Sequence, residues 1–426
     1  MSIMLSLLSC KAKPVDVNVS ESSSLDMFSD NSDNSDSSEY SGDSELYSLS
    51  SSITDTSDNG YSYSKISGST KSSNSTKNSS SNISSQAVTS SLPGSSSAVP
   101  TIAPTIKKPL FVGISPSNNV GIPESEWLAY RELGIKSLRI HLQYKNIGSS
   151  VTNPNFSKYD IVVNRAKKEG IDVTMLLSYE SYPSVSEPLN LGWGEIMKFT
   201  NSIELIPIAK LAITHFKTLG VKKWEIWNEQ NGTWNVDYNS YAELLTQLYE
   251  KCKYTEKWDT TATIAFGGLD AVDVNFTDGV NGAAQNYVKQ FYMSNAYANF
   301  KAKYKRSPFD AFCIHPYNTI DVSATAGITK NVMAVALQKT IINVMDNNGD
   351  KGMPIWITEY GNQDSNEDKN ARAVYESILA IYAIPQVEIL HWFKYCYVGS
   401  NYSIVFGDGT KRKSYYSFRD AVLLLK

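Results

Sequence analysis

The segment KKWEIWNEQN, from Lys222 to Asn231, is an apolar run that ends abruptly in an amide and a carboxylate. The segment MPIWITEYGN, from Met353 to Asn362, ends in a carboxylate in the same way. Both runs have the length of a strand, and their near-continuous apolar character is typical of strands that are buried on both faces. Glu229 and Glu359 therefore stand at the exits of two buried strands.

Eight such apolar runs alternate with amphipathic, helix-like segments from Leu110 to the end of the chain. This alternation predicts an α/β fold of the (β/α)₈ TIM barrel type. A doubly wound open sheet is the competing interpretation, but it requires a glycine-rich turn after the first strand. The sequence VGISPSNNVG at that place lacks this turn. The strands are expected at residues 110–115, 136–142, 171–178, 221–228, 260–268, 309–315, 353–359 and 387–395.

Helices are expected between these strands, because their apolar residues recur at helical spacing. Pro123 and Gly134 are typical of a helix start and a helix end. Pro207 is expected to kink its helix or to mark where the helix begins. The eight helices are expected at residues 123–134, 156–170, 203–220, 240–254, 284–304, 330–349, 370–383 and 415–425.

The N-terminal part of the 426-residue chain has a different composition. Residues 20–100 contain 33 serines, ten acidic residues and three lysines, so this segment carries a charge of −7. The whole chain carries −4, so the rest sums to +3. The segment has too few large apolar side chains to offset the entropy of ordering. We expect residues 11–107 to form a disordered serine-rich tether and residues 108–426 to form the barrel.

The first residues, MSIMLSLLSC, contain an apolar run that is too short to span a bilayer. It is also shorter than the apolar region of a usual secretory signal. The letters LLSC resemble a bacterial lipobox, in which Cys10 would be lipidated and become the mature N-terminus. Residues 1–10 would then be a short signal, and the protein would lie in the cell envelope or outside the cell, attached to a membrane. An accidental match in a cytoplasmic protein is the alternative.

Several partners are disfavoured by composition. No block of Lys and Arg interleaves with aromatic residues, so we expect no nucleic acid partner. The four cysteines, Cys10, Cys252, Cys313 and Cys396, form no CxxC pair. We therefore expect no zinc site, and no cofactor or other metal is expected either.

The two carboxylates suggest a chemistry once they are placed in a barrel. In this fold the chemistry sits at the C-terminal ends of the strands. Glu229 would lie at the top of the fourth strand and Glu359 at the top of the seventh, facing each other across the mouth. A pair of carboxyl groups in this position fits glycoside hydrolysis, in which one protonates the leaving oxygen and the other attacks the anomeric carbon or activates water.

The sequence WNEQN followed by ITEYGN resembles clan A of the retaining glycoside hydrolases. The resemblance implies that Glu229 is the general acid/base, that Glu359 is the nucleophile and that Asn228 contacts a sugar hydroxyl. Arg139 in LRIHL resembles the arginine that holds the nucleophile. The resemblance further implies that the substrate is a carbohydrate and that residues 108–426 are the catalytic domain.

Further matches extend the resemblance to the whole barrel. His315 and Tyr317 in IHPYN resemble residues that line the cleft around the nucleophile, and Trp392 in LHWFKY resembles the sugar-stacking floor. Arg139-Ile-His141 fits the pattern of family 39 within the clan, so His141 is expected in the substrate site. Gln230 departs from this pattern, which usually has proline at that position. Family 5 and its relatives therefore remain an alternative to family 39.

Each of these residues also has a structural interpretation. A lone Glu or Arg is more often part of a structural ion pair, and His141 fits a core histidine equally well. For Trp392, which we expect at the sugar platform, a core tryptophan is the alternative. Trp193 and Trp234, in loops above the barrel, either add sugar subsites or cover its rim. We expect a retaining hydrolase of β-linked oligo- or polysaccharides. A surface carbohydrate-binding or adhesion protein on an inactive barrel and a transglycosylase are the alternatives.

Overall fold

The computed structural model describes residues 109–148, 150–189, 196–271, 283–317, 320–322, 329–331 and 333–426. The expected signal at residues 1–10 and the expected tether at residues 11–107 lie outside the described residues, as does Trp193. All statements about the fold below refer to the described part of the chain.

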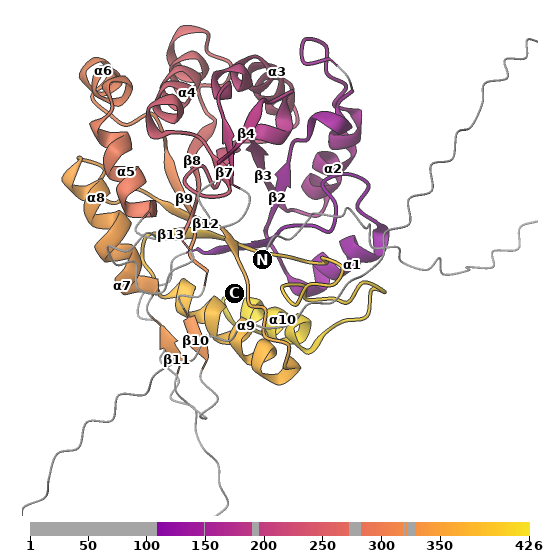
Figure 1. The fold of residues 1–426 in the computed structure, drawn as a ribbon. Coiled ribbons are helices and arrows are strands. Elements are labelled where there is room, and N and C mark those ends of the chain that lie inside the picture. The colour runs from indigo at the N-terminus through magenta and orange to yellow at the C-terminus, as the bar shows by residue number, and fades with distance from the viewer. Residues whose placement is uncertain are drawn as a thin grey trace, which may run out of the picture. The chain divides into compact units, whose positions relative to one another are not determined.

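Eight parallel strands close into a barrel at the centre of the molecule (Figure 1). Each strand overlaps one of the eight predicted apolar runs, and two strands extend one or two residues beyond the predicted end, so the predicted (β/α)₈ fold is confirmed. The strands follow one another round the barrel in the order β1 (Phe111–Ile114), β13 (Val387–Trp392), β12 (Ile355–Tyr360), β9 (Ala311–His315), β8 (Thr263–Asp270), β6 (Lys223–Asn228), β3 (Asp172–Leu177) and β2 (Ser137–His141).

Helices form the outer layer around the strands (Figure 1). Pro207 lies in the first turn of α3, where its missing N–H is not needed for an intrahelical bond. The helices are α1 (Glu124–Leu133), α2 (Ser157–Lys168), α3 (Leu205–Lys217), α4 (Tyr238–Glu250), α5 (Ala283–Met293), α6 (Asn295–Tyr304), α7 (Met333–Leu337), α8 (Asn343–Asn347), α9 (Glu367–Tyr382) and α10 (Lys413–Leu424).

Two of the predicted helices are interrupted. Residues 284–304 form two helices rather than one, because Ser294 stops α5 and caps α6 by accepting a hydrogen bond from the Tyr297 N–H. Serine competes with the helix backbone for hydrogen bonds, which favours such a cap. Between α7 and α8 the backbone forms a π-helical turn, Gln338–Ile342, and a second such turn, Lys251–Thr255, follows α4.

Side chains alternate between the barrel interior and the surrounding helices, as they must along a strand. A small buried cluster inside the barrel consists of Ala265, Ala311, Cys313, Trp356 and Ile389. Residues two positions farther along three of these strands, namely His315, Thr358 and His391, continue the same inward-facing rows and are also buried. The barrel interior is therefore apolar in its middle and polar toward the C-terminal ends of the strands.

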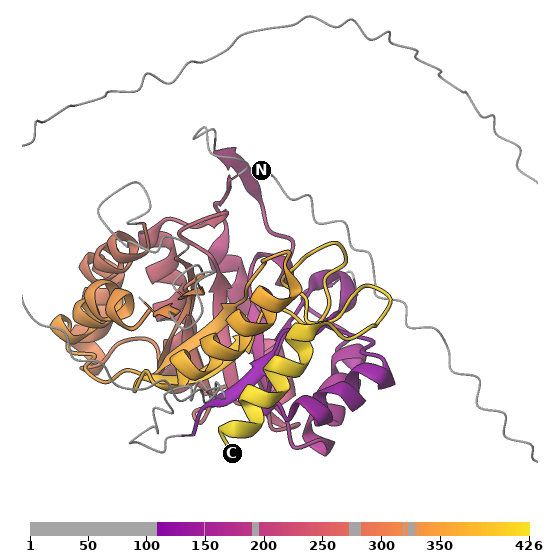
Figure 2. The same ribbon diagram turned by 90° about the horizontal axis from the view of Figure 1, so that it is seen from below.

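Short elements decorate the barrel. A three-stranded sheet joins residues that follow β3 and β6, and part of it rises away from the barrel in Figure 2. Its strands are β4 (Ser186–Leu189), β5 (Ile196–Phe199) and β7 (Trp234–Asn235), and a separate antiparallel pair is β10 (Ile320–Val322) and β11 (Thr329–Asn331). Single 3₁₀ turns lie at Tyr144–Asn146, Tyr179–Ser181 and Ser202–Glu204.

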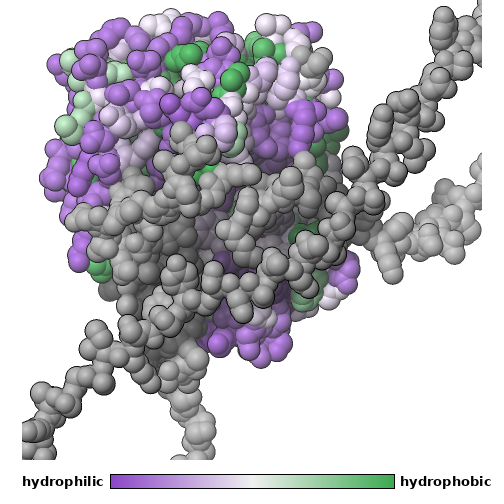
Figure 3. Space-filling view, in the orientation of Figure 1, coloured by the Kyte–Doolittle hydropathy of each residue, from purple (hydrophilic) through white to green (hydrophobic). Residues whose placement is uncertain are grey.

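The described surface on one face of the molecule is mainly polar (Figure 3). On the face shown in Figure 3, hydrophilic residues predominate among the described ones, and hydrophobic residues are scattered between them. No helix in the described ranges combines the length and the apolar character needed to cross a membrane.

Close contact between β1 and β2 makes Gly113 sensitive to substitution. A Cβ atom at this position would lie 2.3 Å from the Ser137 carbonyl oxygen and 2.7 Å from the His391 ring. We expect Gly113→Ala to lower the free energy of unfolding by about 1–3 kcal/mol, because the barrel wall must shift to accept the methyl group. Gly407→Ala is the matched control, since its Cβ would meet Val398 at an ordinary 3.4 Å. Urea unfolding measures both, and equal stability of the two variants would contradict the prediction.

Candidate active site

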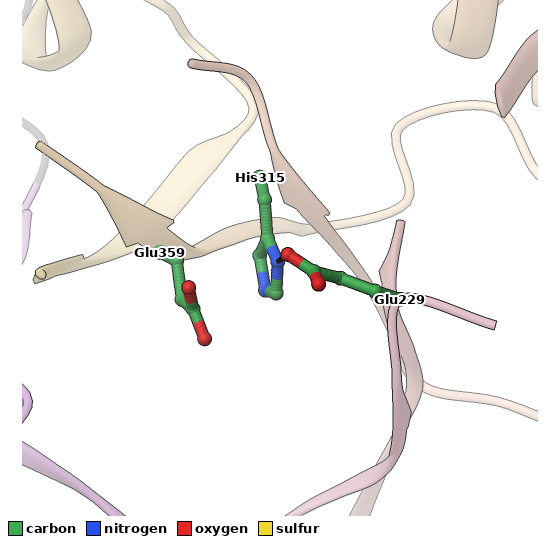
Figure 4. A group of neighbouring side chains, drawn as sticks. All are labelled: Glu229, His315 and Glu359. Atoms are coloured by element: carbon green, nitrogen blue, oxygen red, sulfur yellow. Dashed lines mark hydrogen bonds and ion pairs between the residues drawn. The ribbon is translucent and has the colours of Figure 1, made fainter. Parts of the chain in front are cut away.

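Two carboxylates meet at the C-terminal mouth of the barrel. Glu229 follows β6 directly, and Glu359 is the penultimate residue of β12. A carboxylate oxygen of each and a ring nitrogen of His315 all lie within 4.8 Å of one another. Figure 4 shows the His315 ring between the two carboxylates. The parallel strands thus bring together residues that are 130 positions apart in the sequence.

Arg139 of β2 binds the carboxylate of Glu359 from inside the barrel. Its Nη1 donates to Glu359 Oε1 at 2.5 Å, and its Nε donates to Glu225 Oε2 at 2.6 Å. Its Nη2 donates to Glu225 Oε1 and to Asn228 Oδ1. One buried guanidinium therefore links β2, β6 and β12 and fixes the Asn228 amide in one orientation.

The charge state of Glu359 follows from these contacts. Burial alone would raise the pKa of its carboxyl, but the charges of His315 and Arg139 outweigh burial and hold the pKa below its ordinary value. The hydroxyl of Tyr317 donates to Glu359 Oε2 at 2.9 Å and stabilises the same ionised form. Glu359 is thereby an ionised carboxylate held by two donors.

His315 of β9 contacts the other carboxylate. Its Nδ1 lies 3.1 Å from Glu229 Oε1, and its Nε2 lies 3.0 Å from Thr358 Oγ1. The Thr358 hydroxyl donates its only hydrogen to Glu225 Oε1 at 2.8 Å, so it must accept from His315 Nε2–H. Nδ1 is then the nitrogen that changes protonation, accepting from a protonated Glu229 or donating to an ionised one.

Charge distribution in the site favours a protonated His315. Burial alone would lower the pKa of its imidazole, but the charge of Glu359 and the nearby carboxylates of Glu225 and Glu229 raise it to about 9. The pKa of Glu225, which burial alone would raise, lies well below its ordinary range because of the Arg139 charge. Glu225 is thus a permanent buried anion beneath the site.

His141 lies beside the main cluster rather than within it. Its Nε2 lies 2.8 Å from Ser178 Oγ, and its Nδ1 lies 3.0 Å from a carboxylate oxygen of Glu180. The Glu180 carboxylate also accepts from Gln143. His141 therefore belongs to a second polar group on the side of the mouth formed by β2 and β3.

Trp392 does not reach the mouth, which corrects its expected role as the sugar-stacking floor. Its side chain is fully buried and packs edge to face against Phe418 of α10 and against Tyr360. His391, one position earlier, takes the inward direction and contacts Ser137 at 2.7 Å. Alternation along the strand places consecutive residues on opposite faces, so an assignment made one residue off selects the wrong face.

Phe393 is the aromatic residue of this strand end that lies near the site. Its ring centroid lies 5.9 Å from that of Tyr402, and the Tyr402 ring lies 5.6 Å from that of Tyr317, which binds Glu359. The family resemblance assigned the sugar platform to Trp392, because indoles are common sugar platforms. The neighbouring Phe393 carried no such signal.

Two further carboxylates of the site were missed by sequence reasoning. Glu225 lies four residues before Glu229 in the apolar run KWEIW, and its inward position follows from strand alternation. Asp270 ends β8, beyond the predicted end of that strand. Burial, and then the charge of Glu229, raise the pKa of Asp270 to about 7.

The aromatic cluster beside Glu229 gives Trp234 a structural contact. Its ring stacks on that of Tyr179 with centroids 4.4 Å apart, and Tyr179 stacks on Phe199 on its other side. The Trp234 carbonyl also accepts from the Trp227 indole. One face of Trp234 is therefore covered by protein.

Glu229, His315 and Glu359 offer one ligand atom each within chelating reach of one another. Their donor atoms already have protein partners, because both oxygens of Glu359 accept hydrogen bonds and His315 Nδ1 contacts Glu229.

No protein-family model and no curated protein matches the sequence. Solved structures do. A family 39 glycoside hydrolase from the gut symbiont Bacteroides cellulosilyticus WH2 matches with 18% identity and a TM-score of 0.51, over 75% of this chain and 64% of its own. A GH39 enzyme from Xanthomonas axonopodis pv. citri matches with 12% identity and a TM-score of 0.50, over 75% and 67% of the two chains.

A monomeric β-xylosidase from Caulobacter crescentus CB15 matches with 14% identity and a TM-score of 0.51, over 74% of this chain and 68% of its own. This chain thus spans less than two thirds of the length of the Bacteroides enzyme. At these identities the likeness shows the fold. The predicted barrel fold is thereby confirmed, and family 39 glycoside hydrolases are among the structures that share it.

The elevated pKa of His315 predicts how stability depends on pH. An unfolded histidine titrates near 6.5, so the folded state binds this proton more tightly. The resulting stabilisation is complete below about pH 6.5 and is lost as the pH rises through about 9. We expect the free energy of unfolding to fall by on the order of 3 kcal/mol across this window.

Urea unfolding at both ends of the window measures this loss. His315→Gln should remove most of the difference, whereas His215→Gln, on the outer face of α3, should leave it intact. A pH dependence that is the same in the wild type and in His315→Gln would contradict the assignment.

Proposed function

We propose that the protein is a retaining glycoside hydrolase that cleaves β-linked oligo- or polysaccharides. The observation that carries this proposal is the pair Glu229 and Glu359, whose nearest carboxylate oxygens lie within 4.8 Å at the barrel mouth. Retaining enzymes hold their two carboxyl groups about 5–5.5 Å apart, whereas inverting enzymes leave room for a water at about 6.5–9.5 Å. The short separation supports the retaining class.

The first step forms a covalent intermediate. The Glu359 carboxylate attacks the anomeric carbon while Glu229 transfers its proton to the glycosidic oxygen, so the leaving sugar departs as an alcohol. Arg139 and Tyr317 keep Glu359 ionised and aimed from below. Because Asn228 Oδ1 accepts from Arg139, its NH₂ group is the part that donates to a sugar hydroxyl.

The second step returns the enzyme to its starting state. Glu229, now a carboxylate, removes a proton from water as the water oxygen attacks the anomeric carbon and displaces Glu359. Glu229 must therefore alternate between acid and base. His315 Nδ1 can complement both forms, since it donates to the carboxylate and accepts from the acid.

Variants of the two carboxylates test the proposal. We expect Glu359→Ala to abolish turnover of aryl β-glycosides and of polysaccharides by the full-length protein, because no other group can form the glycosyl-enzyme. Glu229→Ala should spare substrates with good leaving groups and regain activity with azide, which needs no general base. Glu388→Ala, an exposed residue on the same barrel, is the control.

Initial-rate assays across a panel of sugars give the substrate at the same time. Anomeric proton NMR of the first product then distinguishes retention from inversion. Full activity of Glu359→Ala would overturn the proposal. Sugar binding without turnover by the wild type would favour a carbohydrate-binding protein, and products longer than the substrate would favour a transglycosylase.

We propose in addition that Cys10 carries a lipid that attaches the enzyme to a bacterial membrane, with the serine-rich segment as a spacer. The sequence LLSC supports this location. In a bacterial host, the wild type should incorporate labelled palmitate and partition into detergent, whereas Cys10→Ala should do neither. Absence of label in the wild type would favour the cytoplasmic alternative.

A further inference from the structure

The backbone around the proposed acid/base residue adopts an unfavourable conformation. Trp227 and Glu229 have φ angles of +78° and +50°, in the left-handed region that residues with a side chain rarely occupy. Such a conformation persists only where the surroundings determine it strongly. The contacts that hold the segment 229–232 (the acid/base turn) are therefore of functional interest.

The end of β8 provides these contacts. The Glu229 N–H donates to the Gly268 carbonyl at 2.8 Å, and within the turn the Gly232 N–H donates to the Glu229 carbonyl at 2.9 Å. Gly268 leaves space for the site, since a Cβ there would lie 2.1 Å from His315 Nε2. The backbone of the acid/base turn is thus fixed at one point to β8.

Two side chains of the acid/base turn add three more hydrogen bonds to β8. The Gln230 side chain is fully buried and donates from Nε2 to the Gly267 carbonyl at 3.0 Å. Asn231 makes a reciprocal pair, because its Nδ2 donates to the Asp270 carbonyl at 2.8 Å and its Oδ1 accepts from the Asp270 N–H at 2.9 Å. The consecutive amide side chains of the turn therefore bind two residues of β8, Gly267 and Asp270.

We propose that Gln230 and Asn231 are positioning residues that hold the Glu229 carboxyl where it can protonate the leaving group. The inference rests on the proposed function and deepens it. In the family pattern a proline occupies position 230 and restricts the turn by its ring. Here hydrogen bonds from side chains to β8 supply the restriction instead.

Loss of the Gln230 or Asn231 contacts should impair proton transfer from Glu229 and leave attack by Glu359 unaffected. Glu359 of β12 is held by Arg139 of β2 and by Tyr317, which follows β9. The side chains of Gln230 and Asn231 bind β8 instead. If the amide contacts are lost, the turn can relax toward ordinary φ values and carry the Glu229 carboxyl away from His315. The nucleophile then stays in place while the acid is displaced.

Leaving-group dependence tests this proposal in the full-length protein. For Asn231→Ala, kcat/KM should fall about tenfold to a hundredfold on phenyl glycosides and disaccharides, whose leaving groups need a proton. It should stay within about twofold of the wild type on 2,4-dinitrophenyl glycosides, whose leaving group departs without one. Gln230→Met, which conserves side-chain volume, should show the same pattern. It serves as the test variant if Asn231→Ala folds poorly.

Asn366→Ala is the matched control. The Asn366 side chain, like that of Asn231, makes two hydrogen bonds to the backbone. It accepts from two N–H groups at the start of α9, away from the acid/base turn. This variant should show no change in leaving-group dependence. An unchanged kcat/KM in both Asn231→Ala and Gln230→Met, or an equal loss on all substrates, would overturn the proposal.

A second readout does not depend on turnover. The chain has four histidines, so His315 can be followed by NMR titration. Groups facing His315 include Glu225, Glu229, Glu359 and Asp270, and only Glu229 lies on the acid/base turn. Asn231→Ala should lower the pKa of His315 from about 9, whereas Asn366→Ala should not.

This titration separates two kinds of failure. A wild type without activity on any glycoside, together with a lowered pKa of His315 in Asn231→Ala, would reject the proposed function but keep the positioning role. An unchanged pKa of His315 in Asn231→Ala would reject the positioning role whatever the activity.

Discussion

A single buried cation, the Arg139 guanidinium, organises the mouth of the barrel. It is only 6% exposed and pairs with two carboxylates, one from β6 and one from β12. A cation taken out of water must be compensated by anions and satisfied donors, or burial strongly disfavours it. Glu225 supplies a permanent counter-ion below, and Glu359 supplies one at the surface of the cleft. The remaining contacts of the site are arranged around this requirement.

The neighbouring groups extend this charge arrangement through hydrogen bonds. The Thr358 hydroxyl accepts a hydrogen bond from His315 Nε2 and donates one to Glu225. The imidazole is therefore fixed at Nε2 and free to exchange a proton at Nδ1. Glu359 and Glu229 therefore differ in surroundings. One is held by an arginine and a tyrosine as a permanent anion, and the other contacts a group that can give or take a proton. This difference is what a two-step displacement requires of two otherwise identical side chains.

The sequence predicted the barrel because strands buried on both faces leave long apolar runs, and each of the eight runs was visible. It also predicted the neighbourhood of Glu229, Glu359, Arg139, His315 and Tyr317, because parallel strands end at one mouth. The error at Trp392 arose where the strand ends and a shift of one residue exchanges the two faces. The break at Ser294 depended on a local cap that competes with a strong helical pattern. Contacts such as Asn231 with Asp270 join distant segments, and no local pattern marks them.

The two counter-ions of Arg139, Glu225 and Glu359, differ in what their loss would mean for the fold. Loss of Glu225 would remove a bidentate contact and leave Arg139 paired with Glu359 alone, whereas loss of Glu359 would leave the cation neutralised from below by the bidentate contact with Glu225. Glu359 is thus the counter-ion whose removal costs Arg139 the fewer hydrogen bonds. A chain that lacks Glu359 can therefore keep its buried arginine paired, so the packing of the barrel alone does not account for this carboxylate.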